Sequence, residues 1–249
     1  MEITQAMAQV LSNSESLLND PNFVQAFLSV AAYPYDPELA WYYKLEEVVR
    51  HLDEQQSSDF VEKLQFNPDM AEMISQHYFG PQYKLKDLQR DCPPGSLGYA
   101  YYHHMTRNGI PAYEYSAFEA SDDISYIKLR KMQTHDIWHV ITGYNTNIFE
   151  ELALQGFYQG QTPTVYQTLL MLALVLHFAT VQTKDLNTAL EALFEGWHRG
   201  RTARPLWAVR WEEMWQRPLA DIQAEYNITP RSVGDSHDLS TKKILSFKM

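Results

Sequence analysis

The stretch SDDISYIKLRKMQTHDIWHVITGYNTNIFEE, residues 121–151, decides the fold that the sequence predicts. Its first part has the length and composition of one long helix, from about Ser121 to Thr142. Gly143 follows, and glycine commonly ends helices because it adopts the left-handed conformation without strain. Asn145-Thr146-Asn147 then offers capping side chains for a new helix that carries Glu150 and Glu151. We therefore expect two antiparallel helices joined by a short turn.

The rest of the chain continues the helical pattern. We see no alternating strand pattern that pairs with another, and no internal repeat. The sequence predicts an all-α, single-domain, bundle-like fold over residues 1–228, followed by a polar tail over 229–249. The further predicted helices cover about 24–32, 38–52, a segment from 60, 67–80, 97–108, 163–181, 186–200 and a broken segment at 206–226.

Composition excludes several classes of function. The 249 residues carry a formal net charge of -11, so a nucleic-acid partner is not expected. Cys92 is the one cysteine, which rules out an intrachain disulfide and a cysteine-based zinc or iron–sulfur site. The first twenty residues lack a basic region and resemble neither a secretory signal nor a transit peptide. We therefore expect a cytoplasmic location.

His135-Asp136-Ile137-Trp138-His139 carries the candidate chemistry. His135 and His139 are four residues apart, so both imidazoles stand on one helical face. Asp136 lies at the edge of that face. Glu151 comes twelve residues after His139, and the turn at Gly143 would bring it back toward the histidines. Two histidines with one or two carboxylates suit zinc, ferrous iron or manganese.

Spacing alone leaves two other interpretations of these residues open. Two histidines at helical spacing also occur as a buried pair that a neighbouring carboxylate satisfies without any metal. A zinc protease helix has the pattern His-Glu-x-x-His, and here Asp136 replaces the glutamate that acts as general base. Because the aspartate side chain is one methylene shorter, peptidase activity is not favoured.

At this point the sequence resembles the Coq4 family of ubiquinone-biosynthesis proteins. The motif His-Asp-x-x-His, eleven residues and then Glu151 is that family's motif, and Gly143 with Thr146-Asn147 resembles its turn. The resemblance is clearest over residues 93–228. Its other matching segments are Pro93-Pro94-Gly95-Ser96-Leu97-Gly98, Gly196-Trp197, Gly200, and Arg210-Trp211-Glu212-Glu213 through Pro218-Leu219.

The resemblance implies a mostly helical fold and a divalent metal ion held by His135, Asp136, His139 and Glu151, which would also be the catalytic residues. Zinc is the first candidate, with iron, manganese or magnesium as alternatives. The implied substrate is a polyprenyl lipid or quinone precursor, and the implied reaction is oxidative decarboxylation, which replaces a ring carboxylate by a hydroxyl group. The family also implies a peripheral position at a membrane surface, a homodimer and contacts with other quinone-biosynthesis proteins.

Three residues beside the predicted ligands depart from the family pattern. Asn145 stands where many members have proline, Glu150 where many have glycine, and Trp138 is bulkier than the usual aliphatic residue. Because these residues adjoin the ligands, substrate and reaction can differ from those of the family. Two alternative functions therefore stay open, a non-catalytic isoprenoid-binding scaffold that organises biosynthetic enzymes and a zinc-dependent hydrolase.

Residues 152–183 contain no charged side chain, and the apolar run Leu169–Phe178 within them predicts a buried helix that is apolar on nearly all sides. It is too short and too often interrupted for a transmembrane helix, which needs about 20 apolar residues. Met171, Leu174 and Phe178 share one face of this helix and are candidates for lining a lipid tunnel, although the same face can simply be core. His177 is expected to be a hydrogen-bonded core histidine.

Two polar clusters complete the candidate residues. Arg199, Arg201 and Arg204 form a local basic patch that suits an anionic head group, or else these arginines pair with nearby glutamates and complement the end of a helix. His103 and His104 adjoin several tyrosines. Because adjacent residues of a helix point to different faces, a second metal site is not expected there.

Overall fold

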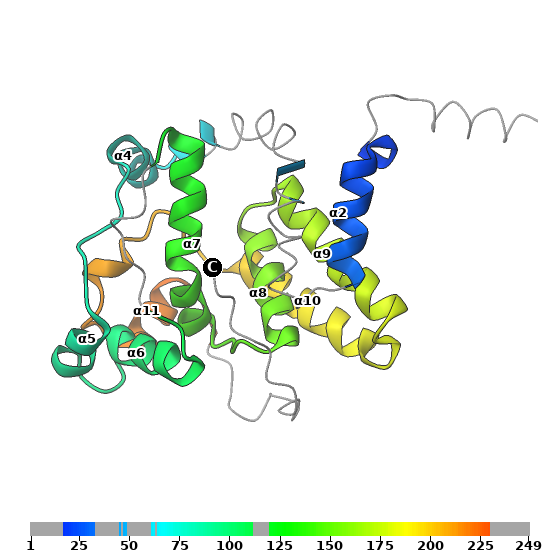
Figure 1. Ribbon diagram of the computed structural model, residues 1–249. Helices are drawn as coiled ribbons and strands as arrows, with labels where there is room; N and C mark the ends of the chain where they lie inside the picture. The colour runs from blue at the N-terminus through cyan, green and yellow to red at the C-terminus, as the bar shows by residue number, and fades with distance from the viewer. Residues whose placement is uncertain are drawn as a thin grey trace, which may run out of the picture.

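The computed structural model describes residues 17–32, 45, 47–48, 61–62, 64–111 and 120–229 of the chain. Within these ranges the chain forms helices and irregular connections without a β-sheet, which confirms the predicted all-α fold class. Helix α7 (Asp123–Thr142) stands between two groups of helices (Figure 1). One group contains α4 (Pro68–Gln76), α5 (Leu85–Asp91), α6 (Leu97–Asn108) and α11 (Leu219–Glu225), and the other contains α2 (Pro21–Ala32), α8 (Ile148–Gln161), α9 (Val165–Thr180) and α10 (Leu186–Thr202).

Local side-chain chemistry fixes both ends of α7. The Asp122 carboxylate accepts a hydrogen bond from the backbone N–H of Ser125 at 2.7 Å, and the Ser125 hydroxyl accepts one from the backbone N–H of Asp122 at 3.0 Å. This capping box satisfies N–H groups that the first turn leaves without helical partners. At the other end Gly143 has φ 77° and donates its N–H to the carbonyl of His139. The predicted helix is confirmed, with its start at residue 123 instead of 121.

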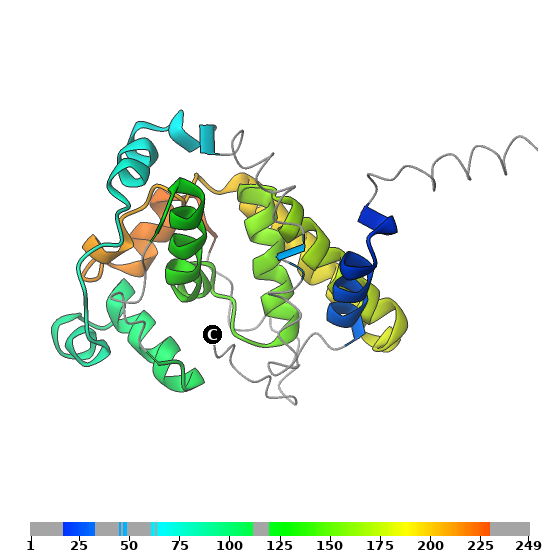
Figure 2. The same ribbon diagram turned by 45° about the horizontal axis from the view of Figure 1, so that its top comes forward.

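The turn after α7 is closed by side chains. Asn147 caps α8 by accepting hydrogen bonds from the backbone N–H groups of Phe149 and Glu150, each at 3.1 Å. The Glu150 carboxylate accepts hydrogen bonds from the backbone N–H of Asn145 and the side-chain amide of Asn147, each at 2.8 Å. As a result α8 runs back alongside α7, as the sequence predicts (Figures 1 and 2).

Helices α8 and α10 approach one another at the level of the backbone, and they lie side by side in both views (Figures 1 and 2). Two glycines on each helix make this possible. A Cβ atom at Gly196 would overlap the carbonyl oxygen of Ala153, and one at Gly156 would overlap the carbonyl oxygen of Leu193. Gly160 and Gly200 are equally crowded by the opposite backbone. The contact therefore tolerates no side chain at these positions.

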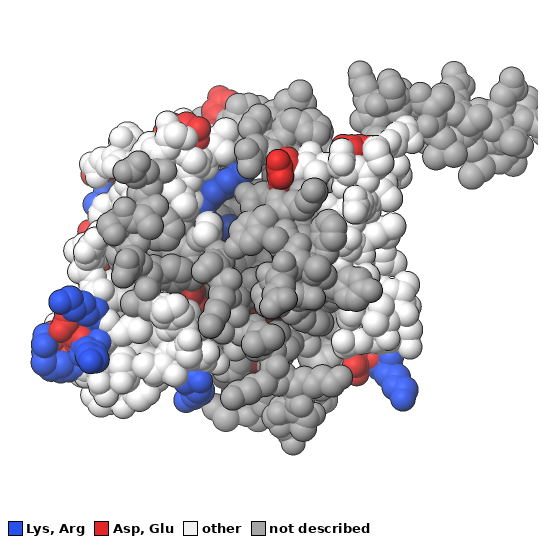
Figure 3. All heavy atoms as spheres, viewed as in Figure 1, with Lys and Arg blue, Asp and Glu red and all other residues white. Residues whose placement is uncertain are grey.

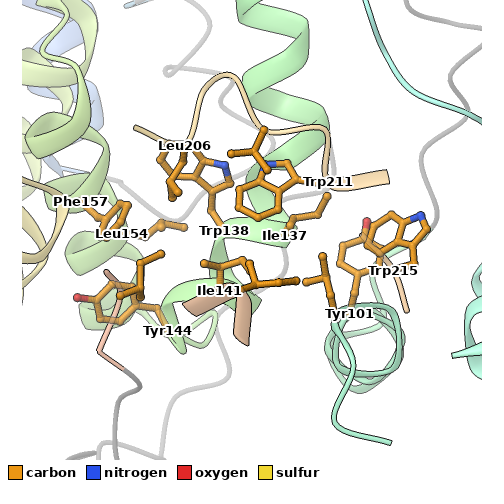
Figure 4. Packing of buried hydrophobic residues seen from close by; sticks show 14 of the residues in the cluster. Tyr101, Ile137, Trp138, Ile141, Tyr144, Leu154, Phe157, Leu206, Trp211 and Trp215 are labelled. Carbon is orange, nitrogen blue, oxygen red and sulfur yellow. The ribbon is translucent and has the colours of Figure 1, made fainter. Parts of the chain in front are cut away.

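The largest buried hydrophobic cluster of the described residues surrounds the C-terminal half of α7 (Figure 4). Trp138 is 1% exposed and stacks on Tyr158 of α8, with ring centroids 4.4 Å apart and an interplanar angle of 14°. Phe157 contacts the same indole edge-on at 5.8 Å. The bulky Trp138 is thus a core residue that joins α7 to α8, which explains its size beside the motif histidines.

A second buried cluster joins α9 to α2, α8 and α10. Leu174 and Phe178 are buried in it, whereas Leu172 on the opposite face of α9 is 52% exposed. The predicted buried helix is therefore confirmed for the side of α9 that packs against α2, α8 and α10, whereas Leu172 lies on a side that is exposed.

No single helix in the described ranges is long and apolar enough to cross a membrane. One pair reaches that length and composition when taken together, α9 with the segment Thr183–Thr202, but it bends by 113° at the break between its two parts.

A buried ion pair connects α7 to the C-terminal segment. Arg130 donates hydrogen bonds to both carboxylate oxygens of Glu212 at 2.6 and 2.9 Å, and the two side chains are 2% and 0% exposed. Arg130 also donates to the side chain of Gln133 and to the carbonyl of Val209. Removing one member of such a pair leaves an uncompensated buried charge, so this bidentate contact fixes how the segment after α10 packs on α7.

The other helix predictions can be compared with the described ranges. Helices α4 and α6 begin at Pro68 and Leu97, close to the predicted starts, and are capped by Asn67 and Ser96. The broken segment at 206–226 contains a short 3₁₀ helix at Trp211–Glu213 followed by α11. Most of the predicted helix at 38–52, the start of the one from 60 and the tail after residue 229 lie outside the described residues.

We expect Gly196→Ala to lower the free energy of unfolding by about 1–3 kcal/mol, because the new Cβ atom overlaps the backbone of α8. Helix propensity alone predicts the opposite sign, since alanine stabilises a helix interior by about 1 kcal/mol relative to glycine. Urea denaturation followed by circular dichroism measures the difference.

The control for this variant is Glu191→Ala, an exposed position on the same helix, which should change the unfolding free energy by less than about 0.5 kcal/mol. A Gly196→Ala protein as stable as the wild type would show that α8 and α10 do not pack as closely as described.

Candidate metal centre

Two histidines of the last turns of α7 face one another. The Nε2 atoms of His135 and His139 are 3.2 Å apart, and the two rings are nearly perpendicular with centroids 4.8 Å apart. His139 is completely buried, while the side chain of His135 is 19% exposed. The four-residue spacing therefore presents two imidazole nitrogens to one small volume, as the sequence predicts.

Glu151 reaches the same volume from the first turn of α8. Its Oε1 lies 3.2 Å from Nε2 of His139, and its Oε2 lies 3.8 Å from Nε2 of His135. Among the described residues these three side chains are the one group of histidine, cysteine, aspartate or glutamate whose ligand atoms all lie within 4.8 Å of one another. The turn at Gly143 thus brings together residues that are twelve positions apart in the sequence.

The far nitrogens of both rings also have partners. Nδ1 of His139 lies 3.1 Å from the carbonyl oxygen of Tyr144, which can only accept a hydrogen bond, so Nδ1 carries the proton of the neutral ring. The lone pair of that ring is then on Nε2, which faces the cluster. Nδ1 of His135 lies 3.4 Å from the hydroxyl of Tyr158. Metal-binding histidines are commonly oriented by such contacts of their second nitrogen.

The charges of the cluster act strongly on one another. Burial and the neighbouring His139 lower the pKa of His135 to about 4, although the carboxylates of Glu151 and Asp136 act to raise it. Burial would lower the pKa of His139 as well, but the charge and hydrogen bond of Glu151 outweigh it and raise that pKa. The pKa of Glu151 is lowered, because the histidines outweigh its burial. Glu151 is therefore an ionised carboxylate beside His139.

Asp136 lies outside the group of three. Its Oδ1 is 3.3 Å from Nε2 of His104 on α6, and both side chains are less than a tenth exposed. Burial acts to raise the pKa of Asp136. The hydrogen bond from His104 and the charges of the nearby histidines outweigh this effect and lower the pKa to about 2. His104 also stacks on His139 at 5.3 Å. The sequence pattern does not connect His104 to this site, because the pairing of α6 with α7 is not encoded in any local spacing.

The three grouped side chains fit a divalent metal ion. Oε2 of Glu151 is buried and has no hydrogen-bond partner in the described structure, which is costly for a carboxylate oxygen unless a cation binds it. The donor set of two imidazole nitrogens and a carboxylate suits zinc, ferrous iron or manganese.

The predicted lipid-binding residues have mixed surroundings. Leu174 and Phe178 belong to the buried core, where Phe178 stacks on Phe149 at 5.4 Å, whereas Met171 is partly exposed. That this face of α9 takes a lipid tail stays a prediction. His177 is buried and its Nδ1 lies 2.8 Å from the carbonyl oxygen of Ala31, which confirms the expectation of a hydrogen-bonded core histidine.

The predicted arginine patch makes structural contacts. Arg199 donates to the carbonyl oxygens of Thr142 and Thr229, lies over the ring of Tyr144 and pairs with Glu195. Arg201 lies over the ring of Trp197 on its own helix, and Arg204 is exposed. A role of these arginines in binding a head-group anion stays a prediction. The contacts of Arg199 favour the alternative in which it ties α10 to the end of α7.

Lys131 lies beside the cluster, although the sequence pattern alone does not single it out. Lys131 precedes His135 by four residues, and its ammonium group donates to the side chain of Gln167 at 2.6 Å. The same group lies 4.7 Å from the ring centroid of Tyr158, the tyrosine that also contacts His135. The helical spacing could have placed Lys131 on the face of the motif histidines, but only the packing of α8 and α9 shows what it contacts.

Known proteins resemble this chain over more than half of its length. Residues 76–232 match the family model described as "Coenzyme Q (ubiquinone) biosynthesis protein Coq4". Among curated relatives, the chain is 27% identical over 144 residues to the mitochondrial ubiquinone biosynthesis protein COQ4 of Uncinocarpus reesii, a match that covers 56% of this chain and 50% of that protein. It is 24% identical over 176 residues to the mitochondrial COQ4 homolog of Bos taurus, covering 68% of this chain and 64% of the relative. The chain thus spans between a half and two thirds of these relatives.

A solved structure shares the fold. A crystal structure from Nostoc punctiforme, described as a ubiquinone biosynthesis protein, aligns with a TM-score of 0.72 at 24% sequence identity and covers 85% of this chain and 99% of that one. The family match includes every residue of the cluster and the segments that hold it, from α5 to α11. The chain therefore belongs to the Coq4 family of coenzyme Q (ubiquinone) biosynthesis proteins.

Proposed function

We propose that this protein binds a polyprenylated quinone precursor with a divalent metal ion at the head group, and that it acts in ubiquinone-type biosynthesis by oxidative decarboxylation of that head group. Family membership supports the pathway. The observation that carries the proposal is the grouping of His135, His139 and Glu151, with a buried Glu151 oxygen that lacks a hydrogen-bond partner.

In this proposal the metal ion is bound by His135, His139 and Glu151, with Asp136 as a fourth ligand. Zinc and ferrous iron suit this donor set best, and manganese is the next candidate. Magnesium is less suited, because it prefers an octahedral set of oxygens. The hydrogen bond from His104 holds the Asp136 carboxylate ionised, which a ligand needs.

The reaction replaces a ring carboxylate by a hydroxyl group and removes two electrons from the substrate, so it requires an oxidant, for which we propose dioxygen. A bound metal would supply Lewis acidity, which orients and polarises the head group. The protein's own residues fix the geometry. The carbonyl of Tyr144 holds the His139 ring so that Nε2 faces the site, and the packing of Trp138 on Tyr158 keeps α8 beside α7.

The polyprenyl chain is proposed to lie along α9, near Met171, Leu174 and Phe178. A long isoprenoid partitions into lipid, so we propose that the protein works at a membrane surface as a peripheral protein. A homodimer and contacts with other quinone-biosynthesis proteins are part of the same proposal.

We expect the purified protein to bind about one divalent metal ion per chain, and His139→Ala to abolish stoichiometric binding, because the central ligand of the cluster is lost. Metal analysis of the proteins after exposure to zinc, ferrous iron or manganese measures this. His198→Ala removes an exposed histidine on α10 and should bind metal as the wild type does.

The function itself is tested with a prenylated hydroxybenzoate under oxygen. The wild type should release carbon dioxide from the ring, and His139→Ala should bind the lipid without turning it over. A wild-type protein that binds an isoprenoid but takes up none of these metals would overturn the metal-dependent enzyme and favour a lipid-binding scaffold. Zinc-dependent cleavage of peptides or esters would point to a hydrolase instead.

The affinity for metal should rise as the pH rises. The pKa of His139 is raised above its ordinary value, and its proton must leave before Nε2 can bind a metal ion. Below that raised pKa each pH unit should therefore change the affinity by about tenfold, and above it the dependence should flatten. Competition with a calibrated chelator between about pH 6 and pH 8 measures the slope. An affinity that is constant over this range would contradict the protonation of His139 in the metal-free site.

A further inference from the structure

A buried hydrogen bond joins α6 to the helix that carries the motif histidines. Nε2 of His104 lies 3.3 Å from Oδ1 of Asp136, and the two side chains are 9% and 5% exposed. An ionised carboxylate can only accept a hydrogen bond, so Nε2 of His104 carries the proton and donates it to Asp136. His104 is therefore a directed donor to one of the proposed metal ligands.

Ion pairs on the surface of the molecule differ from this contact. On α5, Arg90 pairs with Asp87 at 3.1 Å and with Asp91 at 2.6 Å, and charged atoms of both signs gather over this helix at one edge of the molecule (Figure 3). Water screens such exposed pairs, so they constrain the chain only weakly. The hydrogen bond from His104 to Asp136 is shielded from water, where such bonds are electrostatically stronger.

The second ring nitrogen of His104 faces Asn108, one turn further along α6. The Asn108 amide nitrogen donates to the carbonyl oxygen of His104 at 2.9 Å and lies 3.5 Å from Nδ1 of the same residue. The Asn108 oxygen accepts a hydrogen bond from the hydroxyl of Thr146 at 3.1 Å. These partners fix which way the amide faces, so Nδ1 of His104 meets an N–H donor. This arrangement agrees with a neutral ring whose proton is on Nε2.

The contacts of His104 connect three parts of the site. Thr146 belongs to the turn between α7 and α8, whereas His104 and Asn108 belong to α6. The His104 ring also stacks on that of His139, with centroids 5.3 Å apart and an interplanar angle of 23°. His104 thus contacts two of the proposed ligands, Asp136 and His139, without being a member of the group of three.

We infer that His104 is a positioning residue of the metal centre, whose hydrogen bond fixes the Asp136 carboxylate as the fourth ligand. The inference rests on the metal centre of the proposed function and adds α6 to the elements that build it. Asp136 lies outside the group of three, so those side chains do not by themselves fix its position. Ligating carboxylates are commonly held by hydrogen bonds from residues that do not touch the metal ion.

Zinc binding, measured by competition with a calibrated chelator, tests this inference. His104→Phe keeps a flat ring against His139 but removes the N–H donor. It should weaken zinc binding by roughly ten- to a hundredfold, the usual effect of losing such a partner of a ligand. His104→Gln keeps an N–H donor and should restore most of the affinity.

The matched control is His103→Phe, the same substitution at the preceding residue of α6. The ring of His103 contacts Tyr99 and Tyr102 of its own helix and not the metal centre. Zinc affinity should therefore stay within about twofold of the wild type.

A double-mutant cycle shows whether His104 acts through Asp136. Adding His104→Phe to Asp136→Ala should change zinc affinity by no more than about twofold, because the hydrogen bond is already lost. The visible absorption of bound Co²⁺ gives a second readout, since it depends on the number and geometry of the ligands. His104→Phe and Asp136→Ala should change this spectrum in the same way, and His103→Phe should leave it unchanged.

Two results contradict the inference. If His104→Phe binds zinc as tightly as the wild type and gives the same Co²⁺ spectrum, His104 does not position Asp136. If the loss of affinity is as large in the Asp136→Ala background as in the wild type, His104 acts only by packing on His139.

The inference and the proposed function can fail separately. Zinc binding that depends on His104, in a protein that does not decarboxylate a prenylated hydroxybenzoate, would leave the inference standing and remove the proposed reaction. Decarboxylation by a wild type whose metal affinity and Co²⁺ spectrum do not respond to His104→Phe would support the reaction and remove the inferred role of His104.

Discussion

The close backbone contact between α8 and α10 is the constraint on which the rest of the site depends. Gly156 and Gly160 on α8 meet Gly196 and Gly200 on α10 with no room for a Cβ atom, so the two helices form one stiff unit. Every residue that α8 contributes to the site is carried by this unit, including Glu151 and Tyr158. A small shift of α10 would therefore move the carboxylate that faces the α7 histidines.

Helix α7 is held from the opposite side by a different kind of interaction. The bidentate contact of Arg130 with Glu212 is fully buried, and it anchors the middle of α7 to the C-terminal segment. The glycine contact is steric and the ion pair is electrostatic, but both act on the same alignment. Between them they fix the two walls of the site, one carrying His135 and His139 and the other carrying Glu151.

Of the polar residues around the cluster, some stabilise the fold and others face the candidate metal site. Glu150 closes the turn through Asn145 and Asn147, which accounts for two of the departures from the family pattern without reference to substrate. Glu151, the next residue, points into the cluster and leaves one buried oxygen without a hydrogen-bond partner. The two neighbouring carboxylates thus have separate roles, and this separation supports a cation as the partner of Glu151.

The sequence by itself determined the helical fold class, the long helix α7 with its end at Gly143, and the grouping of His135, His139 and Glu151. All of these follow from short-range rules, namely the helical period, the capping side chains and the reversal of the chain at a glycine. Only the tertiary structure decided that His104 pairs with Asp136, that Lys131 lies over Tyr158, and that one face of α9 is exposed. Those contacts join helices that are distant in the chain, and their partners are chosen by how the helices pack, which no local spacing encodes.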